Sequence, residues 1–129
     1  MEVVTFEISQ KLKVKGFNEP CYMYYHIHDN IEDSIASLEC TGGESDFINS
    51  YNRYRCAAPT ISQVLKWLRE QHSIHVSTKP YPCEDGAMWL YEIRKFNKYI
   101  SIVAANKTGF TREEHAALAG IEDALENLI

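Results

Sequence analysis

Two stretches in the second half of the chain repeat apolar residues with the period of a helix. The first has apolar positions at i, i+3, i+4 and i+7, the core stripe of an amphipathic helix: Ile61, Val64, Leu65 and Leu68. The second lies at the end of the chain and has Leu118, Ile121, Leu125 and Leu128. Each opens on a threonine followed three residues later by Gln or Glu, as in a capping box: Thr60 with Gln63, and Thr111 with Glu114. This pattern predicts two capped helices.

Between these helices the pattern changes to short extended segments. Three strands are predicted, at Ser73–Thr78, Ala87–Lys95 and Tyr99–Ala105, the last with Ile100 and Ile102 directed inward. Pro80, Pro82 and Gly86 predict a loop over Lys79–Gly86, and Lys107-Thr108-Gly109 predicts a turn before the last helix. Residues 59–129 are therefore expected to form an α-β-β-β-α unit.

The first half of the chain carries a weaker pattern. A helix is predicted over Thr5–Lys15, and Cys21–Asp29 alternates like a strand. Within residues 30–55 the segment Ile31–Cys40 fits either a helical turn or a strand. We expect an α+β fold in one domain over residues 1–129, with an antiparallel sheet covered by helices. Residues 1–58 would supply an N-terminal helix, a strand and an irregular extension to the C-terminal unit.

Composition and charge narrow the functional classes. The chain has 129 residues, 45% of them hydrophobic, and a net charge of −5, which disfavours a general nucleic-acid binder because phosphate binding depends on clustered Lys and Arg. The four cysteines form no CxxC pair, so neither a zinc ribbon nor a redox motif is indicated. The N-terminus lacks the pattern of a signal peptide and no apolar run reaches membrane-spanning length. We expect a cytoplasmic protein without membrane contact.

Two segments resemble small uncharacterised proteins from prophages and mobile elements of Bacteroides and related gut bacteria. They are QKLKVKGFNEPCYMYY (residues 10–25) and APTISQVLKWLREQHSIHV (residues 58–76), with the ending EDALENLI. The resemblance implies a phage-related cytoplasmic protein. It supplies no catalytic residues.

The order of elements in residues 59–129 is similar to that of the double-stranded RNA-binding domain. The final helix adds a matching "AA-x-x-AL-x-x-L" type of pattern in Ala116-Ala117, Ala124-Leu125 and Leu128. RNA binding in that family depends on a lysine-rich start of the last helix, where cations and the helix N-terminus meet phosphates. Here Glu113 and Glu114 occupy that place. The resemblance therefore implies the scaffold more than RNA binding.

One metal-like motif is present in the first half. His26 and His28 are two residues apart on a predicted strand, so both imidazoles can point to one side, and Asp29 can add an oxygen ligand. The alternative is an exposed polar strand face followed by a turn. The sequence identifies no further ligand, and nothing in it indicates a cofactor.

No catalytic motif is found, and an enzyme is not expected. The aromatic residues exceed what one small core needs, and Tyr and Trp are enriched at protein interfaces. We therefore expect a non-enzymatic protein-binding module for a host or phage protein, with a surface formed by Tyr22, Tyr24, Trp89 and Tyr91. The alternatives are that these aromatics join the two halves of the molecule, that the α-β-β-β-α unit binds nucleic acid, and that His26 and His28 bind a metal. The sequence leaves open whether the protein forms a homodimer.

Overall fold

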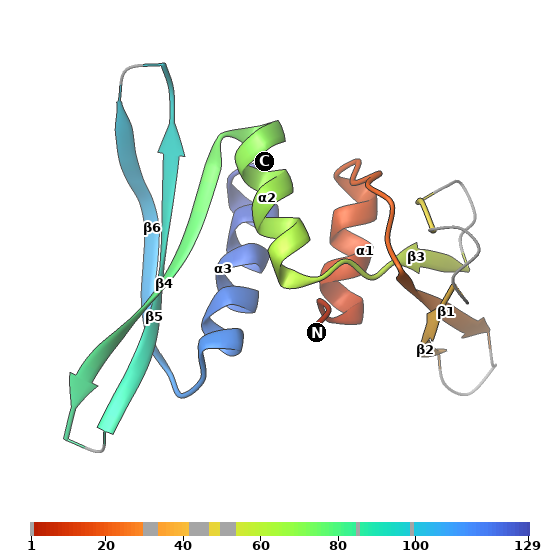
Figure 1. The fold of residues 1–129 in the computed structure, drawn as a ribbon, viewed down its shortest axis with the longest axis horizontal. Coiled ribbons are helices and arrows are strands. Elements are labelled where there is room, and N and C mark those ends of the chain that lie inside the picture. Colours follow the sequence, from red (N-terminus) through yellow and green to blue (C-terminus); the bar gives the residue numbers. More distant parts are fainter. Residues whose placement is uncertain (1, 30–33, 42–46, 50–53, 85, 99) are drawn as a thin grey trace. The chain divides into compact units, whose positions relative to one another are not determined.

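The computed structural model describes residues 2–29, 34–41, 47–49, 54–84, 86–98 and 100–129 (Figure 1). The described residues form three helices and two three-stranded antiparallel sheets, so the predicted α+β class is confirmed. The chain divides into two compact units, unit 1 over Met1–Thr60 and unit 2 over Ile61–Ile129. None of the helices described is long and apolar enough to cross a membrane.

Unit 1 packs one helix with a small sheet. Helix α1 (Phe6–Val14) begins after Thr5, whose hydroxyl accepts a hydrogen bond from the Ile8 amide at 3.3 Å. The sheet has the order β2-β1-β3, with β1 at Met23–Asp29, β2 at Ser34–Cys40 and β3 at Arg55–Ala57. The helix places Ile8 and Leu12 in the core, where Phe17 and Cys56 are also buried.

The weakly patterned residues 30–55 supply one of these strands and the first residue of another. Strand β2 shows that residues 34–40 of the ambiguous segment are extended, and β3 begins at Arg55. Asn49 lies before β3 and links this strand to Phe17. Its side chain donates a hydrogen bond to the Phe17 carbonyl and accepts one from the Ala57 amide, each at 2.8 Å.

Unit 2 has the predicted order of one helix, three antiparallel strands and a second helix. Its elements are α2 (Ile61–His72), β4 (Ile74–Cys83), β5 (Gly86–Phe96), β6 (Ser101–Phe110) and α3 (Glu113–Asn127). The sheet order is β4-β5-β6, and both helices lie on the same side of it (Figure 1). The opposite side of this sheet is therefore left without a helix of its own unit.

The core of unit 2 lies between the helices and the sheet. It contains Val64 and Leu68 of α2, Ile121 and Leu125 of α3, and Ile74, Val76 and Ile93 of the sheet. Helix α3 packs closely on the sheet at Gly120, where an added Cβ would lie 2.7 Å from Val76 Cγ1. Tyr91 is buried beside this contact, and its hydroxyl donates to Asp123 at 2.7 Å.

The strands of unit 2 are longer than predicted. Lys79–Cys83 continues β4 through Pro80 and Pro82, because a strand at the edge of a sheet tolerates the missing N–H of proline. Strand β6 likewise runs through residues 107–109, where Gly109 takes a φ of 100°, so the predicted turn is wrong. The Thr111 capping box is also wrong, since α3 has Arg112 at its N-cap and no side-chain cap bond.

Candidate protein-interaction surface

The four aromatic residues expected to form a surface differ in exposure. Tyr22 is 57% exposed, whereas Tyr24 is half-buried with its ring stacked on Phe47 at 4.9 Å between centroids. Trp89 is half-buried on the same face of β5 as Tyr91. Tyr91 is only 4% exposed, so its assignment to an exposed surface is wrong. The reason is the close approach of α3, which encloses the ring and pairs its hydroxyl with a carboxylate.

The two histidines of the metal-like motif do share one face of β1. Their ring centroids lie 4.9 Å apart, and His28 Nε2 lies 2.7 Å from Ser37 Oγ on β2. Asp29 lies in β1, but its side chain falls outside the description. Among the described side chains no group of three or more potential ligands converges. The geometry brings together two imidazoles, and metal binding stays a prediction.

A larger apolar surface lies where the sequence predicted a buried strand. The end of the β5–β6 hairpin exposes four large hydrophobic residues, which we call the arm patch: Phe96 (44%), Ile100 (56%), Ile102 (56%) and Val103 (46%). The prediction that Ile100 and Ile102 point into the core is therefore wrong. The hairpin continues beyond the ends of both helices of unit 2, so neither helix covers this part of the sheet (Figure 1).

The arm patch has apolar residues on both faces of the hairpin. Strands β5 and β6 pair Phe96 with Ser101, Lys95 with Ile102, and Arg94 with Val103. Because paired residues share a face and successive residues alternate, Val103 and Phe96 lie on one face and Ile102 on the other. Large exposed apolar patches on soluble proteins mark interaction sites. A surface that is apolar on two faces suits a partner that touches the hairpin from its side.

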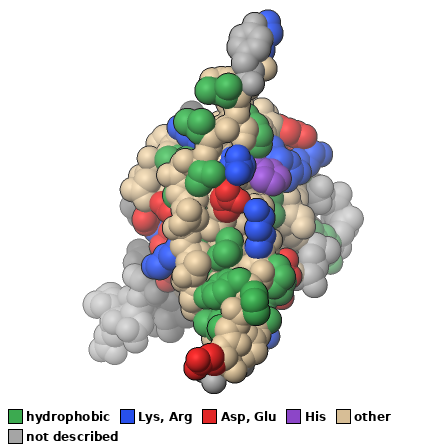
Figure 2. All heavy atoms as spheres, turned by 90° about the vertical axis from the view of Figure 1, so that its left-hand side faces the viewer, with side chains coloured by type: hydrophobic (Ala, Val, Ile, Leu, Met, Phe, Trp, Pro, Cys, Tyr) green, Lys and Arg blue, Asp and Glu red, His purple; other side chains and the backbone are tan. Residues whose placement is uncertain are grey.

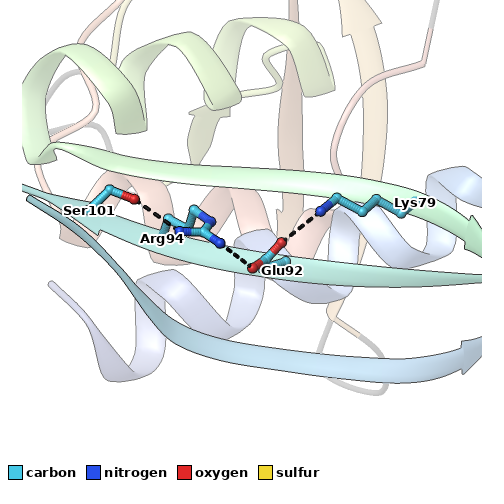
Figure 3. A network of polar contacts seen from close by, with 4 residues as sticks. All are labelled: Lys79, Glu92, Arg94 and Ser101. Atoms are coloured by element: carbon cyan, nitrogen blue, oxygen red, sulfur yellow. Dashed lines mark hydrogen bonds and ion pairs between the residues drawn. The ribbon is translucent and has the colours of Figure 1, made fainter.

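Charged residues occupy the middle of the open sheet face. Hydrophobic side chains gather towards its two ends, with cations and a carboxylate between them (Figure 2). Glu92 lies at the centre, 3.0 Å from Lys79 Nζ and 3.2 Å from Arg94 Nη2, and Arg94 also donates to Ser101 Oγ at 3.1 Å (Figure 3). The hydrogen bond from Lys79 holds the pKa of the Glu92 carboxyl below its ordinary value. This network holds Arg94 beside the arm patch.

The hairpin itself is basic in a chain that is acidic as a whole. Residues 86–110 contain one acidic residue, Glu92, and four basic residues: Arg94, Lys95, Lys98 and Lys107. The net charge of the whole chain is −5. A partner that docks on the arm patch would therefore meet positive potential, which attracts acidic groups.

A hollow of about 210 Å³ lies elsewhere on unit 2, where α2 and α3 begin. Its apolar wall includes Leu65 and Val76, and its rim carries Glu113 and Glu114. Glu113 accepts a hydrogen bond from Thr78 Oγ1 at 3.1 Å. These carboxylates would repel a phosphate, as the sequence indicated.

Comparison with known proteins does not identify a family for this chain. Neither the models of known families, nor the curated proteins, nor the solved structures contain a match to this chain. The likeness to prophage proteins and to the double-stranded RNA-binding domain stays a prediction from the sequence.

Proposed function

We propose that the protein is a non-enzymatic binding module that holds a partner protein through the arm patch. The observation that carries this proposal is the exposure of Phe96, Ile100, Ile102 and Val103 on one hairpin. Leaving such side chains in water forgoes roughly 25 cal/mol for each Å² of apolar surface that a partner would cover. The aromatic surface expected from the sequence is replaced in this proposal by an aliphatic one with a single ring.

The resemblance to prophage proteins supports a host or phage protein as the partner, met in the cytoplasm. The net charge of −5 and the absence of a recognised catalytic motif in the sequence support binding rather than catalysis. Stable interfaces bury about 800 Å² on each partner. The arm patch would then serve as the apolar centre of an interface whose rim includes the Lys79–Glu92–Arg94 network.

The test compares proteins retained by immobilised wild type with those retained by the double variant Ile100→Ser, Ile102→Ser. A Bacteroides lysate is the source that the resemblance suggests. Val14→Ser is the matched control, because Val14 is 83% exposed but lies on α1. We expect a protein that binds wild type and the control, and that binds the double variant at least roughly thirtyfold less, since such central apolar anchors contribute more than about 1 kcal/mol each. Equal retention by all three would contradict the proposal.

Nucleic-acid binding by unit 2 is the alternative, and the cations of the β5–β6 hairpin favour it. Glu113 and Glu114 oppose it at the start of α3. Titration of labelled double-stranded RNA and DNA at low salt separates the two functions. Binding with a steep dependence on salt concentration would replace protein binding as the proposed function.

A further inference from the structure

We infer that the arm patch receives an extended acidic segment of the partner, which pairs with β6 as a fourth strand of the sheet. This inference rests on the proposed function and specifies its partner. It follows from three properties of the first residues of β6: the direction of their backbone groups, the contrast with the rest of the sheet edge, and the surrounding charge.

The backbone groups of Ser101 and Val103 point away from β5. Asn97 N–H donates to the Ile100 carbonyl at 3.0 Å, so residues 97 and 100 form a hydrogen-bonded pair. In antiparallel strands such pairs alternate with non-hydrogen-bonded ones, which makes Lys95–Ile102 the next bonded pair. Ser101 and Val103 therefore direct their N–H and C=O groups to the open edge of β6. Within the described chain β5 is the only strand that pairs with β6.

The second half of the same edge is protected. Two irregularities in the β5–β6 register fall after Val103, and Lys107 places a charge in the strand. The Gly109 N–H is already bonded to the Tyr81 hydroxyl at 3.0 Å. Bulges, lysines and occupied donors are the means by which proteins prevent unwanted strand pairing. Their absence from Ser101–Val103 leaves a short stretch open to a partner strand.

The second half of the opposite edge of the sheet is protected as well. Strand β4 carries Pro80 and Pro82, and neither residue has an N–H to offer a further strand. Strand addition at β6 is thus favoured over addition along the second half of β4. Main-chain bonds give such complexes their affinity, and pockets for alternate side chains give specificity.

The charge around this edge selects the chemistry of the added segment. Lys95, Lys98 and Lys107 lie on the hairpin, and Arg94 flanks Val103 across the strand pair. A segment that alternates apolar and acidic residues would cover Ile102 with its apolar side chains on one face of the hairpin and meet Arg94 with its acidic side chains on the other face. A basic segment would be repelled.

The probe is a synthetic, end-capped peptide of about ten residues that alternates valine and glutamate, long enough for a typical strand. Its binding to ¹⁵N-labelled protein is followed by amide chemical shifts and hydrogen exchange. We expect the largest shifts, and slowed exchange, at the Ser101 and Val103 amides. A peptide with lysine in place of glutamate should bind roughly tenfold more weakly, because it brings like charges together.

Two substitutions at one position separate strand addition from side-chain docking. Val103→Pro keeps an apolar residue but removes the outward N–H, whereas Val103→Thr keeps the N–H and lowers apolarity. Strand addition predicts a loss of roughly tenfold or more for proline and only a few-fold for threonine, since an unpaired main-chain group costs more than a partly exposed methyl. If the Val103→Pro variant binds like wild type while the Ile100→Ser, Ile102→Ser variant loses binding, the arm patch binds its partner without strand pairing. Strand addition is then wrong, and the proposed function stands.

The wild-type exchange data decide the matter even if Val103→Pro does not fold. Unchanged exchange at Ser101 and Val103 in saturating peptide would overturn strand addition. So would a peptide-free dimer in which these amides are already protected, because a second copy would then occupy the edge.

Discussion

At the scale of single residues, burial decides which side chains of a similar type can act on the surface. Tyr22 and Tyr91 look alike in the sequence, yet one is 57% exposed and the other 4%. Burial, together with the hydrogen bond to Asp123, raises the pKa of Tyr91 to about 12. Cys56 is a parallel case, since burial raises the pKa of its thiol to about 11. Both groups stay protonated at neutral pH and serve the core.

The raised pKa of Tyr91 makes stability depend on pH in alkaline solution. The unfolded tyrosine loses its proton near pH 10, whereas the folded one keeps it to about pH 12, so its contribution is complete below pH 10 and is lost as the pH rises to about 12. The loss should be about 1–3 kcal/mol of unfolding free energy. Tyr91→Phe should be less stable than wild type by about 1 kcal/mol at neutral pH.

Urea unfolding of wild type and Tyr91→Phe between neutral pH and about pH 11 checks this prediction. The stability gap between them should shrink as the pH rises. Tyr22→Phe, which removes an exposed hydroxyl, is the control and should follow wild type. A gap that stays constant for Tyr91→Phe would show that Tyr91 ionises like an exposed tyrosine.

At the scale of helices and strands, periodicity predicted element type better than element length. The apolar stripe predicts α2 correctly, because Val64 and Leu68 are buried as a core-facing stripe requires. The sequence predicts that the strand of β4 ends at Thr78, because Pro80 and Pro82 follow. A proline is compatible with a strand at a sheet edge, and edge position is a property of the assembled sheet. The alternation of residues does not predict the exposure of Ile102, for a similar reason. Alternation shows which face a residue occupies, but only the helix lengths show whether that face is covered there.

The contact between α3 and the sheet predicts that Gly120→Ala destabilises the protein. The new methyl would lie 2.7 Å from Val76 Cγ1 and 3.1 Å from Tyr91 Cγ, closer than such atoms approach. Overpacking of this kind costs about 1–3 kcal/mol, against about 1 kcal/mol gained in helix propensity. We expect a net loss, measured by thermal or urea unfolding.

Ala119→Gly is the matched control for Gly120→Ala, because it changes the neighbouring position, which is half-buried, in the opposite sense. It should lose about 1 kcal/mol from helix propensity alone. If Gly120→Ala raised the stability instead, α3 would have room to move from the sheet. The double variant Val76→Ala, Gly120→Ala should be less destabilised than the sum of the two single variants if the clash with Val76 is the cause.

At the scale of the whole molecule, each unit has a core of its own. In unit 1, Ile8, Leu12 and Phe17 are fully enclosed, and in unit 2 Leu68, Ile93 and Ile121 are. The division at residues 60 and 61 falls close to the change of pattern that the sequence shows at residues 58 and 59. The aromatic residues expected to form one surface lie in both units, and the exposed arm patch belongs to unit 2.

This division predicts that residues 61–129 fold when expressed alone. Domains of about 60 residues bury roughly 60% of their unfolded surface and many are stable in isolation. The fragment should show the circular dichroism of a mixed helix and strand protein, unfold cooperatively, and bind the alternating valine–glutamate peptide as the full chain does. A fragment without cooperative unfolding would show that unit 2 depends on residues 1–60.

The prolines of β4 have a consequence for how many molecules can associate. A sheet with two receptive edges can bind a strand on each side, and repeated head-to-tail addition then produces open filaments. Pro80 and Pro82 remove two N–H groups from one of these edges, so we expect a complex formed through β6 to be complete after one addition. The protein is thereby monovalent for strand pairing, and an excess of partner should saturate it at one strand for each chain without growth into polymers.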